Sequence, residues 1–124
     1  MISLFLVEDM KPIQGALAEL LAAAGVQVAG VATTEAEANL WLDEHAGAWD
    51  GAIIDLVLAE GTGMGVVAHA RRQSPAAPIA VFSEFATPGI EAHCLRLGAN
   101  AVFDKARGPG ELIAWCRRIA QRPQ

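Results

Sequence analysis

The chain has 124 residues, 53% of them hydrophobic, which is enough for one domain with a packed core and argues against disorder. Its 9 Lys and Arg against 14 Asp and Glu leave a net charge of −5, which argues against a nucleic-acid-binding surface because phosphate contacts need clustered basic side chains. Cys94 and Cys116 lack metal-ligand spacing, so we interpret them as reduced thiols.

The N-terminus runs from Met1 directly into an apolar segment without a basic leader. No run of about 18 uncharged apolar residues follows, so no membrane-spanning segment is expected. We therefore predict a cytoplasmic protein with a single domain over residues 1–124.

Short apolar runs alternate with helical patterns along the chain. The runs predict strands at 2–7, 26–31, 52–55, 79–83 and 101–103. Helices are predicted between them, with Thr34 and Glu37 forming a capping box, Thr87 as an N-cap before Pro88, and Pro109 opening the last helix. Five such alternations predict an α/β fold, a doubly wound parallel sheet with helices on both faces.

Polar residues stand where the predicted strands end. Glu8 and Asp9 follow the first strand, Asp55 ends the third, Ser83 ends the fourth, and Lys105 follows the fifth. Because the carboxyl ends of parallel strands share one edge of the sheet, these residues are expected to converge there. Taken alone, Asp55 could equally cap the turn that follows it.

Such a cluster of carboxylates needs a counter-charge. At an effective dielectric near 20, two carboxylates about 4 Å apart repel by roughly 4 kcal/mol, so a bound cation is expected. A set of oxygen ligands without His or Cys suits Mg²⁺ rather than Zn²⁺. With Lys105 and the Ser83 hydroxyl nearby, the carboxylate of Asp55 could accept a phosphoryl group.

Over almost its whole length the chain resembles the receiver domain of two-component response regulators. The resemblance rests on Glu8-Asp9, the run from Asp55 to Leu58 with Gly63 eight positions after Asp55, Ser83, the turn at 98–101, Phe103 and Lys105. It implies a flavodoxin-like, five-stranded parallel sheet in the order 2-1-3-4-5. It also implies a signalling protein rather than an enzyme.

The resemblance implies a role for each matching residue. Asp55 would be the phosphoacceptor, taking a phosphoryl group from a histidine kinase or a histidine phosphotransfer protein. Asp9 would bind Mg²⁺ directly, Glu8 mainly through water, and Val57 through its backbone carbonyl. Lys105 would pair with the carboxylate or with the phosphoryl group.

The resemblance also implies a switch. Ser83 would move to bond a phosphoryl oxygen, and Phe103 would swing inward behind it. The face formed by the fourth helix, fifth strand and fifth helix would then change toward an output protein or a second copy of the chain. Candidates on that face are His93, Arg96, Trp115, Arg117 and Arg118, although Trp115 could instead cover the edge of the core.

Three positions depart from the family pattern. Ala106 follows Lys105 where receivers usually have a proline after a cis bond; a cis bond before alanine would cost roughly 3 kcal/mol, and the sequence leaves cis or trans open. Ala59 replaces another common proline. Glu84 stands where a small residue is usual, and with Phe85 it is expected to gate the pocket, so that dephosphorylation is slow.

Three rival interpretations compete with a receiver domain. A pseudo-receiver would act as an unphosphorylated interaction module, which Glu84 and Ala106 keep open. A phosphatase with an aspartyl nucleophile usually has a second Asp two positions on, where this chain has Val57. A flavodoxin would need a Ser/Thr/Gly-rich phosphate loop after the first strand, and Glu8-Asp9 is the wrong chemistry for it. Whether the chain acts alone or comes from a longer regulator is not decided by the sequence.

Overall fold

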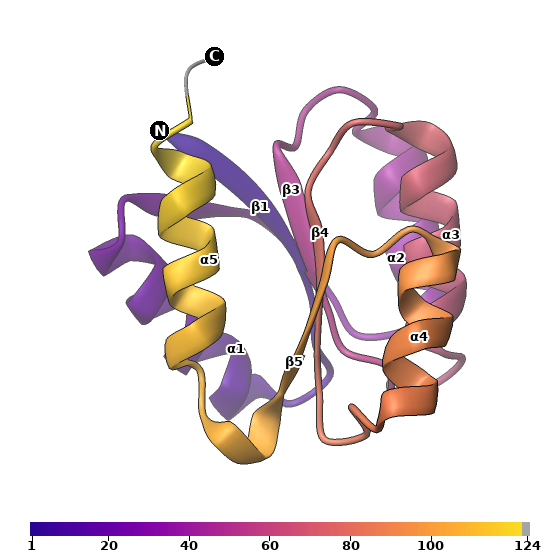
Figure 1. Cartoon of the computed structure of the whole chain (residues 1–124). Coiled ribbons are helices and arrows are strands. Elements are labelled where there is room, and N and C mark those ends of the chain that lie inside the picture. The colour runs from indigo at the N-terminus through magenta and orange to yellow at the C-terminus, as the bar shows by residue number, and fades with distance from the viewer. Residues whose placement is uncertain (123–124) are drawn as a thin grey trace.

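The computed structural model describes residues 1–122 and shows strands and helices in strict alternation (Figure 1). The strands are β1 (Ile2–Val7), β2 (Val26–Ala32), β3 (Gly51–Ile54), β4 (Ile79–Ser83) and β5 (Ala101–Asp104). The helices are α1 (Lys11–Ala23), α2 (Glu35–Glu44), α3 (Gly63–Gln73), α4 (Pro88–Leu97) and α5 (Gly110–Ala120), with a short 3-10 helix η1 (Lys105–Arg107) before α5. The predicted five-fold alternation is confirmed.

All five strands are parallel, in the order β2-β1-β3-β4-β5, as the resemblance implied. The order reverses between β1 and β3, and an open α/β sheet has a crevice at the carboxyl ends of such a pair of strands. Glu8 follows β1 and Asp55 follows β3, so two of the expected acidic residues lie at this reversal. The topology therefore brings together two residues that lie 47 positions apart in the chain.

Helices cover both faces of the sheet. Figure 1 shows α1 and α5 on one side and α2, α3 and α4 on the other. Strand β1 supplies both cores, because Phe5 and Val7 pack toward α2–α4 while Leu4 and Leu6 pack toward α1 and α5. A strand buried on both faces reads as a continuous apolar run, which is why this segment was recognisable as a strand.

The helix starts follow local side-chain chemistry. The hydroxyl of Thr34 accepts a hydrogen bond from the Glu37 amide, and that of Thr87 accepts one from the Ile90 amide, so both predicted N-caps are confirmed. Helix α3 begins at Gly63, where the Thr62 hydroxyl caps it by accepting a hydrogen bond from the Met64 amide.

Trp41 of α2 is the centre of an aromatic stack over the sheet. Its ring lies 4.0 Å from that of Phe5 and 4.2 Å from that of His45, nearly parallel to both. The indole covers Gly30, where any Cβ atom would collide with it. None of the described helices is long and apolar enough to cross a membrane.

Candidate functional site

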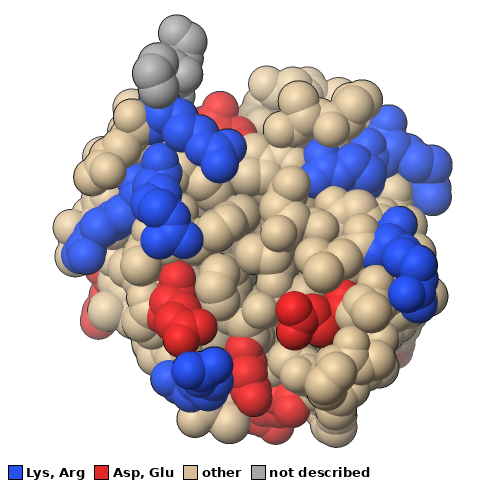
Figure 2. All heavy atoms as spheres, viewed as in Figure 1, with Lys and Arg blue, Asp and Glu red and all other residues tan. Residues whose placement is uncertain are grey.

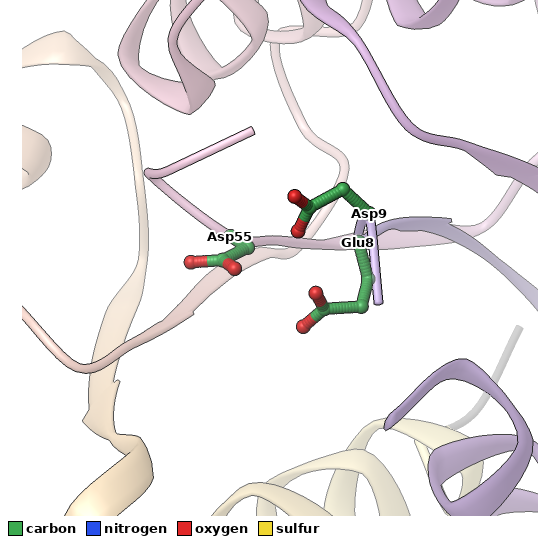
Figure 3. Close-up of side chains that lie close together, drawn as sticks. All are labelled: Glu8, Asp9 and Asp55. Atoms are coloured by element: carbon green, nitrogen blue, oxygen red, sulfur yellow. The ribbon is translucent and has the colours of Figure 1, made fainter. Parts of the chain in front are cut away.

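Three carboxylates meet at the carboxyl edge of the sheet. Oxygen atoms of Glu8, Asp9 and Asp55 lie within 4.8 Å of one another (Figure 3). Glu8 is 1% exposed and Asp55 is 7% exposed, whereas Asp9 is half-buried. Their donor atoms are all hard oxygens, which fits a divalent cation such as Mg²⁺ and not a thiolate- or imidazole-seeking metal.

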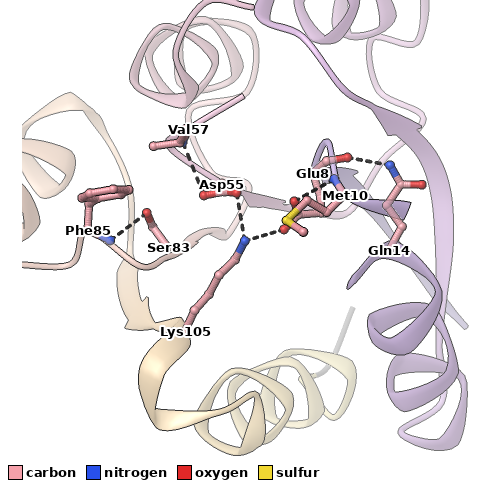
Figure 4. Close-up of polar contacts among 8 residues, drawn as sticks. All are labelled: Glu8, Met10, Gln14, Asp55, Val57, Ser83, Phe85 and Lys105. Atoms are coloured by element: carbon pink, nitrogen blue, oxygen red, sulfur yellow. Dashed lines mark hydrogen bonds and ion pairs between the residues drawn. The ribbon is translucent and has the colours of Figure 1, made fainter. Parts of the chain in front are cut away.

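Lys105 lies against two of these carboxylates. Its ammonium is 2.6 Å from Oε1 of Glu8 and 2.9 Å from Oδ2 of Asp55, and its side chain is 10% exposed (Figure 4). The short η1 helix after β5 begins at this residue. One cation thus balances part of the negative charge, and the structure brings together four of the residues that were expected to converge.

Burial and pairing change the protonation of both partners. Burial raises the pKa of Glu8 above its usual range, although the hydrogen bonds from Lys105 and the Met10 amide oppose it. Burial alone would lower the pKa of Lys105, but its hydrogen bonds to Glu8 and Asp55 and their charges raise it above the ordinary value. Lys105 is therefore a permanent cation in this site.

The loop after β3 folds back on Asp55. The amide of Val57 donates to Oδ1 of Asp55 at 3.4 Å, and the amide of Gly63 donates to the Leu56 carbonyl at 2.9 Å. A Cβ atom on Gly63 would collide with the carbonyl of Asp55, so only glycine permits this close approach. The loop leaves the side chain of Val57 53% exposed beside the acidic cluster.

A cavity of about 130 Å³ opens from the cluster to solvent. It is lined by Asp9, Met10, Asp55, Val57, Glu84, Phe85 and Lys105. Glu84 and Phe85 thus stand at the pocket where they were expected, and the side chain of Phe85 is 55% exposed. Besides Asp55 and Lys105, the opening is flanked by two acidic side chains, those of Asp9 and Glu84, and by the apolar side chains of Met10, Val57 and Phe85.

Sequence reasoning missed Met10 and Gln14. Met10 is 52% exposed at the rim of the cavity, and its amide donates to Oε2 of Glu8 at 3.1 Å. The side-chain amide of Gln14 donates to the carbonyl of Glu8 at 2.6 Å and fixes the backbone of the acidic pair (Figure 4). Met10 could have been identified in the sequence because it directly follows the acidic pair at the end of a strand. No sequence feature indicated a role for Gln14.

A model of the response regulator receiver domain matches residues 4–117. The chain belongs to this family. No curated protein matches this chain.

Solved structures of receivers share its fold. The non-phosphorylated HemR receiver domain from Leptospira biflexa is 22% identical, with a TM-score of 0.87 over 100% of this chain and 98% of that one. The CheX-CheY-BeF3-Mg complex from Borrelia burgdorferi gives 16% identity and a TM-score of 0.86, and the match covers 96% of this chain and 87% of that one. A Burkholderia pseudomallei response regulator with a phosphorylated aspartic acid, a calcium ion and citrate gives 22% identity and a TM-score of 0.80. The match covers 92% of this chain and 65% of that one.

Phe103 lies on the side of β5 that faces α5. Strand residues alternate between faces, and β5 pairs with β4 so that Phe103 lies opposite Phe82 and Val102 opposite Val81. Phe103 packs toward α5, with its ring 6.2 Å from that of Trp115, while Val102 packs toward α4. Ser83 follows Phe82 and so belongs to the opposite face from Phe103. The inward movement expected of Phe103 upon phosphorylation stays a prediction, and it would take Phe103 away from Trp115.

Ser83 itself is fully buried, and its hydroxyl already has a hydrogen-bond partner. Its hydroxyl accepts a hydrogen bond from the Phe85 amide at 3.2 Å, and it does not line the cavity (Figure 4). A move of Ser83 toward Asp55 would break this bond. In this structure Ser83 therefore holds the start of the β4–α4 loop.

The segment after Lys105 differs from the usual receiver pattern without strain. No cis peptide bond occurs in the described chain, so the Lys105–Ala106 bond is trans. The Ala106 amide donates to Oδ1 of Asp104 at 2.9 Å, a hydrogen bond that a proline cannot make.

Proposed function

We propose that the receiver domain is a phosphoryl-accepting switch in which Asp55 is the phosphoacceptor. One observation carries this proposal: Asp55 is the buried carboxylate that is paired with Lys105 and still faces the open cavity. The other carboxylate bonded to Lys105, that of Glu8, does not line the cavity. Of the two carboxylates bonded to Lys105, only that of Asp55 combines this paired cation with access for a donor.

Each neighbouring group has a part in the transfer. An oxygen of Asp55 attacks the phosphorus of a phosphohistidine, the P–N bond breaks, and the donor imidazole leaves with its electron pair and takes up a proton. The product is an acyl phosphate on Asp55. Lys105, freed from Asp55 by the new bond, pairs with a phosphoryl oxygen. The Ser83 hydroxyl gives up its hydrogen bond with the Phe85 amide and donates to another phosphoryl oxygen.

The acidic cluster would hold the divalent cation that the family resemblance implies. Asp9 and Asp55 would be ligands, together with the Val57 carbonyl, and Glu8 would act mainly through water. When bound, Mg²⁺ would neutralise charge that builds on the phosphoryl oxygens. Glu8 already receives a hydrogen bond from Lys105 at 2.6 Å, which supports its place behind the direct ligands.

The phosphodonor would be a histidine kinase or a histidine phosphotransfer protein. The response would reach an output protein or a second copy through the face of α4, β5 and α5. Four candidate residues on that face are exposed, namely His93, Arg96, Arg117 and Arg118. Figure 2 shows basic side chains gathered over α5 on this side, with acidic ones nearer the carboxyl ends of the strands. Trp115 is half-buried against the core, which favours a structural role for it.

Intact-mass spectrometry after incubation with acetyl phosphate and Mg²⁺ tests the proposal. We expect one phosphoryl group on the wild type, none on Asp55→Asn, and one on Asp43→Asn, which removes an exposed carboxylate from α2. The adduct should disappear when EDTA removes the metal. A wild type that binds Mg²⁺ but never gains the adduct would instead identify an unphosphorylated interaction module.

A further inference from the structure

The loop from Leu56 to Thr62 carries the carbonyl expected to bind the metal, and it is tied to a distant part of the chain. The amide of Thr62 donates to Oε1 of Glu35 at 2.9 Å, across 27 positions of sequence. The amide of Glu35 donates to the Glu60 carbonyl at 3.0 Å. Glu35, the first residue of α2, is therefore hydrogen-bonded to the loop through both its backbone and its side chain. We call these two hydrogen bonds the grip of Glu35 on the loop.

The grip extends to the residues beside Asp55. Thr62 forms an isolated antiparallel bridge with Val57, and its hydroxyl lies 3.4 Å from the Leu56 carbonyl. Val57 in turn donates to Oδ1 of Asp55. A chain of contacts thus runs from Glu35 through Thr62 and Val57 to Asp55, and nothing in it touches the cavity until Val57.

Two glycines make room for the Glu35 side chain. A Cβ atom on Gly61 would lie 2.8 Å from Oε1 of Glu35, and one on Gly65 would collide with its carboxylate. The carboxylate of Glu35 therefore occupies a notch between the end of the loop and the first turn of α3. Any side chain at Gly65 would displace it.

We propose that Glu35 is a positioning residue for the metal site: it holds Thr62 and thereby sets where the Val57 carbonyl and the Asp55 carboxylate lie. This inference rests on the proposed function, because that function supplies the Mg²⁺ site. Glu35 does not itself contact the metal or the phosphoryl group. Removing a residue that orients ligands typically weakens metal binding by about 10- to 100-fold, and the lower end is expected here because Glu35 acts through two contacts.

The test is an NMR titration with MgCl2 that follows the Val57 amide and yields a dissociation constant. We expect Glu35→Ala to weaken Mg²⁺ binding by about tenfold. Glu35→Gln keeps an oxygen that can accept from Thr62, so it should retain near wild-type affinity. Glu44→Ala removes one carboxylate from the other end of α2 and should leave affinity unchanged, because only net charge differs.

A second variant separates positioning from general loss of stability. Gly65→Ala adds a good helix-forming residue to α3 yet pushes the Glu35 carboxylate out of its notch, so it should weaken Mg²⁺ binding while the protein stays folded. Glu35→Ala with Gly65→Ala should bind no more weakly than Glu35→Ala alone, because the displaced group is already gone.

Wild-type affinity in Glu35→Ala would overturn this inference alone, as would equal weakening by Glu44→Ala or by Glu35→Gln. A wild-type protein whose Val57 amide does not respond to Mg²⁺ would overturn the proposed metal site together with it. The two failures are therefore distinguishable in one titration series.

Discussion

The ammonium of Lys105 lies 2.9 Å from Oδ2 of Asp55, although 50 positions of sequence separate the two residues. The same ammonium also contacts Glu8, 97 positions away. A single cation thus joins the ends of β1, β3 and β5, and it faces two carboxylates that burial has largely removed from water. Breaking such an arrangement by removing one partner is costly, because the remaining charges are left uncompensated.

Lys105→Met should therefore lower the free energy of unfolding by about 3 kcal/mol in metal-free buffer. Mg²⁺ should recover part of this loss, because a divalent cation can replace the missing positive charge. Urea denaturation with EDTA and with Mg²⁺ measures both effects. Lys11→Met, which removes the chain's other lysine from the exposed start of α1, is the matched control. An equal effect of both variants would contradict the charge-balance argument.

Glu8→Gln should change how stability depends on pH. Because the pKa of Glu8 is raised on folding, the folded state holds its proton over a range where the unfolded state, with a pKa near 4.5, has lost it. The contribution of Glu8 to stability is thus fully present below pH 4.5 and is lost as pH rises through its folded pKa. In metal-free buffer the stability of wild type relative to Glu8→Gln should fall across that window.

Urea denaturation at a series of pH values provides the measurement, with Glu19→Gln on the exposed side of α1 as a control for losing a surface carboxylate. A stability difference between wild type and Glu8→Gln that rises with pH would show that pairing with Lys105 outweighs burial.

Glu84 and Phe85 should prolong the life of the phosphoryl group, since both line the cavity that opens onto Asp55. Replacing either with alanine should speed loss of the phosphoryl group by about threefold or more, equivalent to about 0.6 kcal/mol of activation free energy. The decay of the phosphorylated mass after removal of acetyl phosphate gives the rate. Leu95→Ala, an exposed apolar residue on α4, should leave it unchanged. A wild-type half-life of seconds would count against a gated pocket.

Gly30→Ala should destabilise the fold by about 1–3 kcal/mol, because its Cβ atom would press into the Trp41 ring that stacks on Phe5. Gly15→Ala should act in the opposite direction. Gly15 lies inside α1 with nothing within 4 Å of the added atom, so alanine should stabilise the helix by up to about 1 kcal/mol. Thermal or urea denaturation of the two variants measures whether each substitution lowers or raises the free energy of unfolding. A neutral Gly30→Ala would mean that the indole shifts without cost.

Local chemistry in the sequence determined the strands and helices. Continuous apolar runs such as Leu4 to Val7 identify strands buried on both faces, and Thr34 and Thr87 mark helix starts through hydroxyls that bond nearby amides. The polar residues at the strand ends were enough to predict the cluster of Glu8, Asp9, Asp55 and Lys105, because all carboxyl ends of a parallel sheet share one edge. These features depend on neighbours in sequence or on topology alone.

Tertiary packing decided the rest. Which face Phe103 occupies depends on strand register, since a shift of one residue reverses every side chain, and the register is set by contacts with β4 rather than by the local sequence. The grip of Glu35 on Thr62, and the fit of its carboxylate against Gly65, join segments whose separation in the chain hides their proximity. Only the folded backbone brings such atoms within hydrogen-bonding distance, so no local pattern in the sequence could predict them.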